Sequence, residues 1–316
     1  MDNLTHSLVG AVLGQAGLKR TTGLAMPALI IGANLPDVDA ACFFRLEGTE
    51  HLAFRRGITH GPPALVLLPL VLAGILWVFD RWQTRRGTRP EGRLPVRFGW
   101  LYAMAFIGCL SHPFFDWLNT YGIRLLEPFS SQWLYGDILF IIDPWLWAIL
   151  IASVWWSRRR EKTGAEWMRA GQVGVAAAAS YIILNGAITA EAEELELNDG
   201  TYSETVASPV PLRFWQRELI FVERDGLHKS GLWRSHWDVG PVRRLTASPL
   251  SFCPIPPATR QLRDVSAFLF WSRAPFAKRA PDGSVILYDA RFYDPRARDR
   301  FSVALPDVQC EELTPP

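Results

Sequence analysis

Long apolar runs dominate the first 190 residues of the chain. A transmembrane helix needs about 20 apolar residues, and four runs approach that length with almost no charge: residues 62–79, 98–117, 138–156 and 172–190. Two shorter apolar runs, 4–18 and 24–35, precede them. At about 1.5 Å per residue, these two are either thin spans or a re-entrant hairpin. The pattern predicts an α-helical polytopic membrane protein with about six membrane-embedded helices.

The hydrophobic pattern changes after residue 190. Residues 191–204 are acidic and polar, and no later stretch is apolar for long enough to cross a bilayer. Three apolar runs, LIFVE (219–223), VSAFLFWS (265–272) and VILYDARFY (285–293), occur among turn signals such as PDGS and predict strands. We therefore expect a membrane helical domain at 1–190 and a small β-rich extracytoplasmic domain at 191–316.

Composition agrees with a membrane protein. The 316 residues are 49% hydrophobic and 20% charged, below the roughly 25% charged residues of soluble domains. The 14 tryptophans suit bilayer interfaces. A net charge of +2 gives no reason to expect a nucleic-acid partner. Arginines are concentrated in the loops 81–97 and 157–169, which the positive-inside rule places in the cytoplasm. Both termini then lie outside it, although Arg45, Arg55 and Arg56 in an outer loop oppose this orientation.

With that topology, ionisable side chains from five segments gather near the outer membrane face. They are His6, Asp37, Asp39, His60, His112, Asp116 and Asp143. Burying such groups unpaired is costly, so inside a membrane they are candidates for function. His112 and Asp116 are four residues apart and share one face of a helix. Asp37 and Asp39 share a face only if Asp-Val-Asp is extended, which a loop after Pro36 permits.

Histidine nitrogens combined with carboxylates, and no obvious cysteine ligand, suit a divalent transition metal: Zn²⁺ first, with Mn²⁺ or Fe²⁺ as alternatives. The candidate ligands are His6, Asp37, Asp39, His60, His112 and Asp116. Six ligands exceed one tetrahedral site and could serve two ions about 3.5–4 Å apart, and the spacing does not choose between one ion and two. Asp143 precedes Pro144 and is better explained as a helix cap. His51, His228 and His236 lack carboxylate partners at a suggestive spacing, and we expect them on the surface.

Four ordered motifs also carry a family resemblance. MDNLTHSLVGAVLG, ANLPDVDA, RRGITHG and SHPFFDWLNTYGIRLLEPF resemble the successive motifs of the YdjM-like family of bacterial inner-membrane proteins. Members are described as membrane-bound metal-dependent hydrolases, and sometimes as LexA-binding. The resemblance covers roughly residues 1–145 and implies a multi-pass inner-membrane protein with a metal site at the six candidate ligands. One departure is HGPP at 60–63, where these proteins often read His-Ser followed by an apolar residue, so the serine hydroxyl that could be a partner of His60 is absent.

These observations favour a hydrolase with a metal site at the extracytoplasmic interface. The metal would activate water and polarise a phosphoryl or acyl oxygen, and Asp39 or Asp116, when not a ligand, would be the general base. Membrane lipids are then the expected partners, and an amphiphilic ester or lipid-linked phosphate the expected substrate. Two alternatives remain open: a transporter or proton relay that uses the same His/Asp set, and a regulatory or binding protein in which the metal is structural.

The four cysteines divide between the segments. Cys109 lies inside an apolar run and is expected to pack there. Cys42, Cys253 and Cys310 fall outside the spans, where disulfides persist. A Cys253–Cys310 bond would close the end of the β-rich domain, but the sequence leaves the pairing open.

Overall fold

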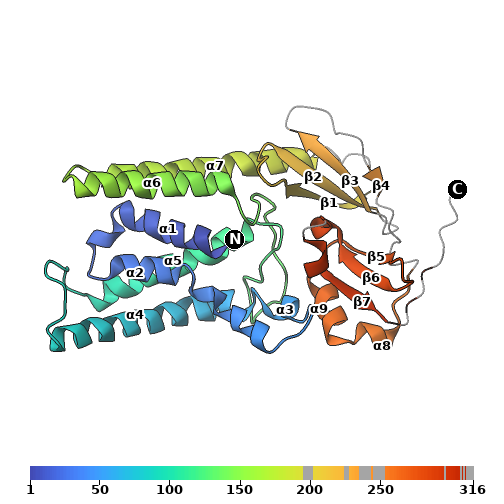
Figure 1. The fold of residues 1–316 in the computed structure, drawn as a ribbon, viewed down its shortest axis with the longest axis horizontal. Coiled ribbons are helices and arrows are strands. Elements are labelled where there is room, and N and C mark those ends of the chain that lie inside the picture. Colours follow the sequence, from blue (N-terminus) through green and yellow to red (C-terminus); the bar gives the residue numbers. More distant parts are fainter. Residues whose placement is uncertain are drawn as a thin grey trace. The chain divides into compact units, whose positions relative to one another are not determined.

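The computed structural model describes residues 1–194, 202–223, 228–234, 243–244, 253–294, 297–306, 308 and 310, with the backbone alone at 202–204, 223, 228–234 and 243–244. The chain forms two compact units, residues 1–39 with 56–185, and residues 40–55 with 186–316. The first unit is helical and the second contains two antiparallel sheets (Figure 1). The domain boundary expected at residue 190 stays a prediction.

Six main helices carry the first unit: α1 (Asn3–Gln15), α2 (Ala25–Gly32), α4 (Pro62–Arg85), α5 (Phe98–Trp117), α6 (Pro144–Lys162) and α7 (Met168–Glu194), the last of which ends in the second unit. Within the described residues, three of them, α4, α5 and α7, are long and apolar enough to cross a membrane. A fourth span results if α2 and the 3-10 helix η2 (Leu35–Phe44) count as one. The expected number of about six spans is not confirmed, because α1 and α2 have only 13 and 8 residues.

The expected span at 138–156 begins later than the apolar run. The side chain of Asp143 accepts hydrogen bonds from the backbone amides of Trp145 and Leu146, and Pro144 occupies the first helical position. Both features start a helix at this point, so α6 begins at Pro144. Its last turns run through Arg158 and Lys162, and the charge of this segment keeps α6 outside the group of candidate spans.

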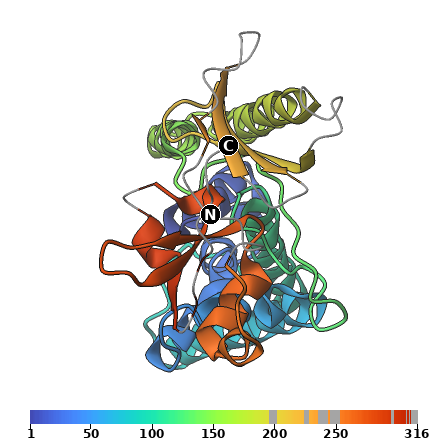
Figure 2. The ribbon, with the colours of Figure 1, turned by 90° about the vertical axis from the view of Figure 1, so that its right-hand side faces the viewer.

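Small residues allow the central helices to pack closely. A Cβ atom added at Gly10 of α1 would meet the Leu29 carbonyl oxygen of α2 at 2.7 Å, and one added at Gly108 of α5 would meet the same oxygen at 2.4 Å. Such backbone approach is the usual means of joining helices in membranes. Ala28, Leu29 and Ala105 lie in the shared core of α2, α4 and α5. Figure 2 shows these helices end-on.

The second unit has two antiparallel sheets. The first contains β1 (Tyr202–Pro209), β2 (Gln216–Glu223), β3 (His228–Arg234) and β4 (Arg243–Arg244) in that order, and the second β5 (Pro275–Arg279), β6 (Val285–Asp289) and β7 (Ser302–Leu305). Val206 and Ile220 of the first sheet share a core with Phe276 of the second. The expected strand at 219–223 is confirmed within β2, and the strand at 285–293 is confirmed to Asp289, where the Asp289 side chain caps a 3-10 turn.

The strand expected at 265–272 is wrong. This segment is the helix α9 (Arg263–Trp271). Its buried residues include Val265, Phe268 and Trp271, which are three residues apart and therefore line one face of a helix. A short apolar run does not distinguish a strand from a buried helix by composition.

Of the cysteines, Cys253 and Cys310 form a disulfide, so the structure selects this pairing. Cys109 is buried within α5, as expected.

Candidate metal centre

Four of the candidate ligands meet in the helical unit. Asp37 comes from η2, His60 from the short 3-10 helix η3 (Ile58–His60), and His112 with Asp116 from the last turns of α5. Each offers one ligand atom, and these atoms all lie within 4.8 Å of one another. His60, His112 and Asp116 have no exposed surface. This buried group of two histidines and two carboxylates could hold a metal ion.

The distances between the ligand atoms suit a small cation. His112 Nε2 and His60 Nε2 lie 3.4 and 3.5 Å from Asp116 Oδ2, and His112 Nε2 lies 3.7 Å from Asp37 Oδ1. With metal–ligand bonds of about 2.0–2.2 Å, ligands at the corners of a tetrahedron are about 3.3–3.6 Å apart. These three separations are close to that spacing, and all four ligand atoms lie within 4.8 Å of one another.

Buried nitrogen atoms without hydrogen bonds give an independent test of this fit. Both ring nitrogens of His6, and the Nε2 atoms of His60 and His112, are buried and have no hydrogen-bond partner. Leaving a buried polar atom unsatisfied costs about 1–3 kcal/mol. A cation bound to His60 Nε2 and His112 Nε2 would remove that cost at these two atoms, so the two side chains fit the metal that the sequence predicts.

The second ring nitrogen of each ligand histidine is held in place. His112 Nδ1 lies 2.7 Å from the Ala33 carbonyl oxygen, and His60 Nδ1 lies 2.9 Å from Thr59 Oγ1 and 3.7 Å from Asp39 Oδ2. Partners of this kind fix the ring orientation and leave Nε2 for the metal. Burial lowers the pKa of His60, against the opposing effect of Asp116 and Asp39, and this favours the neutral ring that binds metals.

Two of the six predicted ligands lie beside the four-residue group. His6 of α1 stacks on His112 with ring centroids 3.8 Å apart, and its Nε2 lies 3.4 Å from Asp116 Oδ1. Asp39 lies behind His60 and accepts a hydrogen bond of 2.8 Å from the backbone amide of Arg56. The Asp-Val-Asp segment is a 3-10 helix and not extended. Asp37 consequently approaches His112, while Asp39 approaches His60.

Arg56 is a functional candidate that the sequence reasoning missed. Its side chain is buried, and its Nε lies 3.1 Å from Asp116 Oδ2. Nη1 donates to Asn119 Oδ1 at 3.0 Å, and the guanidinium lies 4.5 Å from the ring centroid of Tyr121. Its φ of +54° is unusual for a residue with a side chain, and such strained backbone is concentrated at functional sites.

A sequence signal for Arg56 did exist. It lies four residues before His60 in the motif RRGITHG. The topology argument counted it as an outer-loop charge that opposed the positive-inside rule. In the structure this charge is paired inside the protein with Asp116.

The structure also describes some of the ionisable residues that the sequence placed outside the metal site. Asp143 caps α6 as expected, and it also accepts hydrogen bonds from the Tyr181 hydroxyl at 3.1 and 3.0 Å. His51 begins the short helix α3 (His51–Phe54), where its Nδ1 lies 2.9 Å from the Gly48 carbonyl oxygen. His228 belongs to β3, where the backbone alone is described, and His236 lies outside the described residues.

Membrane-length helices around a buried histidine–carboxylate group define a membrane protein with a potential metal site. The model of a family described as "YdjM inner membrane protein" matches residues 1–192, and the chain belongs to this family. It is also similar to "Uncharacterized protein YfhP" of Bacillus subtilis (strain 168). The two are 23% identical over an alignment of 316 residues, which covers 95% of this chain and 88% of that protein. No solved structure matches the chain.

Proposed function

We propose that this protein is a metal-dependent hydrolase of the inner membrane, with Zn²⁺ as the first candidate for its metal. One observation carries the proposal: buried histidine Nε2 atoms from η3 and α5 lie around the Asp116 carboxylate without hydrogen bonds. A cluster needed only for stability would be expected to pair these atoms. In the proposal Asp37, His60, His112 and Asp116 hold the ion, with His6 beside it.

Bound in such a set, a divalent metal supplies an activated water and a Lewis acid for a phosphoryl or acyl oxygen. Arg56 would stabilise the negative charge that develops on the substrate, because its guanidinium is fixed by Asn119 and lies beside Asp116. Asp39 Oδ2 faces His60 Nδ1, the ring nitrogen opposite the proposed ion, so Asp39 would orient this ligand. The Ala33 carbonyl would keep His112 in the correct orientation.

The position of the group on the helices supports a substrate in the membrane. His60 lies just before Pro62, where α4 begins, and Asp116 lies one residue before α5 ends at Trp117. The ends of membrane-spanning helices lie at the level of lipid headgroups. We therefore propose a lipid or lipid-linked phosphate or ester as the substrate, and membrane lipids as the natural partners.

The proposed topology places this group at the extracytoplasmic face with both chain termini on that side. It rests on the arginines of loops 81–97 and 157–169. A Thr88→Cys variant should react with a membrane-impermeant maleimide only after the cells are permeabilised. Labelling in intact cells would contradict this topology and indicate the opposite orientation.

Hydrolysis is tested on the purified full-length protein in detergent. The protein is loaded with Zn²⁺, Mn²⁺ or Fe²⁺ and incubated with bacterial lipid extract and with p-nitrophenyl phosphate esters. Release of phosphate or fatty acid by the wild type, its loss in His112→Ala, and retention in His51→Ala are expected. In Arg56→Gln, turnover should fall by about 10²–10³-fold, as for the loss of other charge-stabilising donors, while bound metal stays near the wild-type content.

If no metal-loaded form of the protein hydrolyses either set of substrates, the proposal of a hydrolase is contradicted. The transporter and the regulatory protein would then be the better hypotheses, and transport by vesicles containing the protein would separate them.

A further inference from the structure

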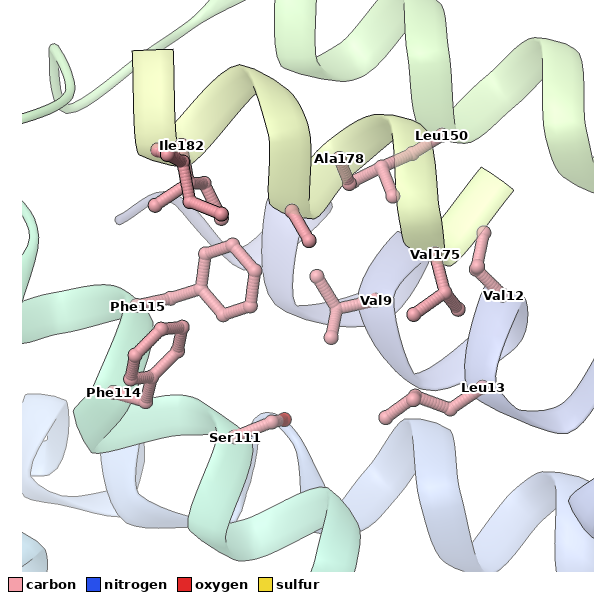
Figure 3. A pocket seen from close by; sticks show the side chains of 12 residues that line it. Val9, Val12, Leu13, Ser111, Phe114, Phe115, Leu150, Val175, Ala178 and Ile182 are labelled. Atoms are coloured by element: carbon pink, nitrogen blue, oxygen red, sulfur yellow. The ribbon is translucent and has the colours of Figure 1, made fainter. Parts of the chain in front are cut away.

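The helical unit contains an apolar chamber next to the metal-centre residues. It has a volume of about 420 Å³ and lies between α1, α5, α6 and α7, within the roughly 300–1,000 Å³ range of small-molecule sites. Figure 3 shows Val9 and Leu13 of α1, Phe115 of α5 and Ala178 and Ile182 of α7 around it. We propose that this chamber holds one hydrocarbon chain of the lipid whose polar group reaches the metal centre. The role of that lipid as substrate rests on the proposed function.

The lining leaves little choice of ligand chemistry. All of the lining residues except Ser111 are apolar, and the Ser111 hydroxyl already donates to the Gly108 carbonyl oxygen at 2.7 Å. A polar ligand would lose its hydrogen bonds with water and gain none from such walls. The chamber therefore suits a ligand made of hydrocarbon.

The chamber and the metal centre use the same two helices. On α1, Val9 of the chamber lies three residues after His6, and on α5, Phe115 lies three residues after His112 and next to Asp116. Residues three apart on a helix are neighbours on its surface, about 5–6 Å apart at Cβ. A chain in the chamber would thus begin within one helical turn of the histidines, at the distance that separates a lipid headgroup from its first methylenes.

The lipid bilayer around the helices would supply the hydrocarbon chain. α5 and α7 are candidate membrane spans, and two lining residues at the edge, Phe114 and Ile183, are 47% and 71% exposed. Apolar surface on a membrane-spanning helix faces lipid chains, which are the solvent at that depth. A single chain can enter from the bilayer without crossing water.

Photo-crosslinking tests the chamber directly. Full-length protein is placed in phosphatidylcholine vesicles that contain phosphatidic acid with a diazirine near the middle of one acyl chain, and labelled residues are mapped by mass spectrometry. We expect labels on Val9, Phe115 and Ile182. Ala178→Trp fills the chamber with a large side chain and should reduce these labels by about tenfold, the factor that 1.4 kcal/mol represents.

The matched control is Ala177→Trp. Ala177 is the preceding residue of α7, exposed and outside the chamber lining, so its labelling should equal that of the wild type. Because Ala178 is buried, retained metal in Ala178→Trp checks its folding, and Ile182→Trp repeats the test at a less buried wall. Labelling confined to exposed residues such as Val71 and Ile75 of α4, or equal labelling in all variants, would overturn the proposal.

The result is separable from hydrolysis. His112→Ala should lose metal and turnover but retain chamber labelling. If lipid is hydrolysed without any chamber label, the chamber proposal is wrong and the hydrolase stands. If the chamber is labelled and metal-loaded protein hydrolyses nothing, the hydrolase is wrong and the hydrocarbon site stands.

Discussion

Asp289 in the β-rich unit and Asp116 in the helical unit are both buried beside an arginine, and the two pairs differ in how completely their polar atoms are hydrogen-bonded. Asp289 in the β-rich unit accepts from Arg291 Nε at 2.9 Å on Oδ1, and from Arg291 Nη2 at 2.9 Å and Ser272 Oγ at 2.5 Å on Oδ2. Asp116 in the helical unit has the side chain of Arg56 and the Met1 amino group as its charged partners. Asp116 is surrounded by buried histidine nitrogens that have no hydrogen bonds, whereas both carboxylate oxygens of Asp289 accept hydrogen bonds.

In the proposed function, this difference separates a structural carboxylate, Asp289, from a functional one, Asp116. Removing a charge from water is costly, and a complete set of hydrogen bonds offsets the cost at Asp289. We call Asp116, His6, Asp37, His60 and His112 the Asp116 cluster. Its unsatisfied nitrogens cost free energy, and a bound cation would offset that cost by accepting their lone pairs. Burial alone does not distinguish the two carboxylates, whereas the unsatisfied histidine nitrogens gathered around Asp116 do. Four variants test this contrast.

The largest loss of stability is expected for Asp289→Asn. One partner of a buried pair is neutralised, which leaves Arg291 uncompensated and should lower the free energy of unfolding by about 3–5 kcal/mol. Denaturant unfolding measures the loss, and metal content should not change. Asp282→Asn in the exposed turn at 281–284 is the control and should stay near the wild type. Equal stability of the two variants would remove the structural role of Asp289.

Acid should weaken the same pair. Burial by itself would raise the pKa of Asp289, but the Arg291 charge and the hydrogen bonds hold it below its ordinary value. The carboxylate thus contributes stability above its unfolded-state pKa of about 3.9, and this contribution is lost as the pH falls through the lower folded value. Asp289→Asn should lack this component, as parallel unfolding curves from neutral to acidic pH would show.

His112→Ala tests the cluster around Asp116 and should weaken its binding of metal. It removes one proposed ligand from a four-residue group, and we expect an affinity loss of more than about 100-fold, beyond the range for residues that only support ligands. Metal analysis of the purified protein and competition with a chelator measure it. Full metal content in this variant would remove the Asp116 cluster from consideration as a metal centre.

Asp39→Asn should have a smaller effect, because Asp39 contacts His60 on the nitrogen opposite the metal. Loss of a carboxylate at such a position reduces metal affinity by about 10–100-fold. Asp143→Asn is a matched buried control, since asparagine also caps helices, and its metal affinity should be unchanged. A larger loss than in His112→Ala would make Asp39 a direct ligand.

The smallest effect is expected for His51→Ala. This histidine contacts the Gly48 carbonyl oxygen and is not part of the group that could hold the ion. Its removal should change the free energy of unfolding by less than about 0.5 kcal/mol and leave the metal in place. Metal loss here would show that the centre is not confined to the Asp116 cluster.

The sequence predicted the helix at 98–117 with the bounds that α5 has, because its apolar run ends where His112 and Asp116 must find partners. It did not predict Arg56, since a basic residue in a polar loop resembles a surface charge until tertiary structure buries it. It left the conformation of Asp-Val-Asp open, and the 3-10 helix there separates the directions of Asp37 and Asp39. The local sequence pattern thus predicted which residue types would gather at the site. Which of them would be ligands and which would support ligands depends on contacts between segments that are distant in the sequence.

The contact of Gly10 and Gly108 with the Leu29 carbonyl has a consequence for how this site can vary. His6 lies one helical turn before Gly10, and His112 lies one helical turn after Gly108, so both rings are positioned from a common point on α2. A shift of either helix by one residue would turn its histidine by about 100° and end the stacking. The connecting segments 16–24 and 86–97 are joined to each other, because the Gly23 amide donates to the Pro95 carbonyl oxygen at 3.1 Å and the Arg97 amide donates to Thr22 Oγ1 at 2.8 Å. A change of length in either segment would therefore disturb the entry to α2, and with it the common point from which both rings are positioned.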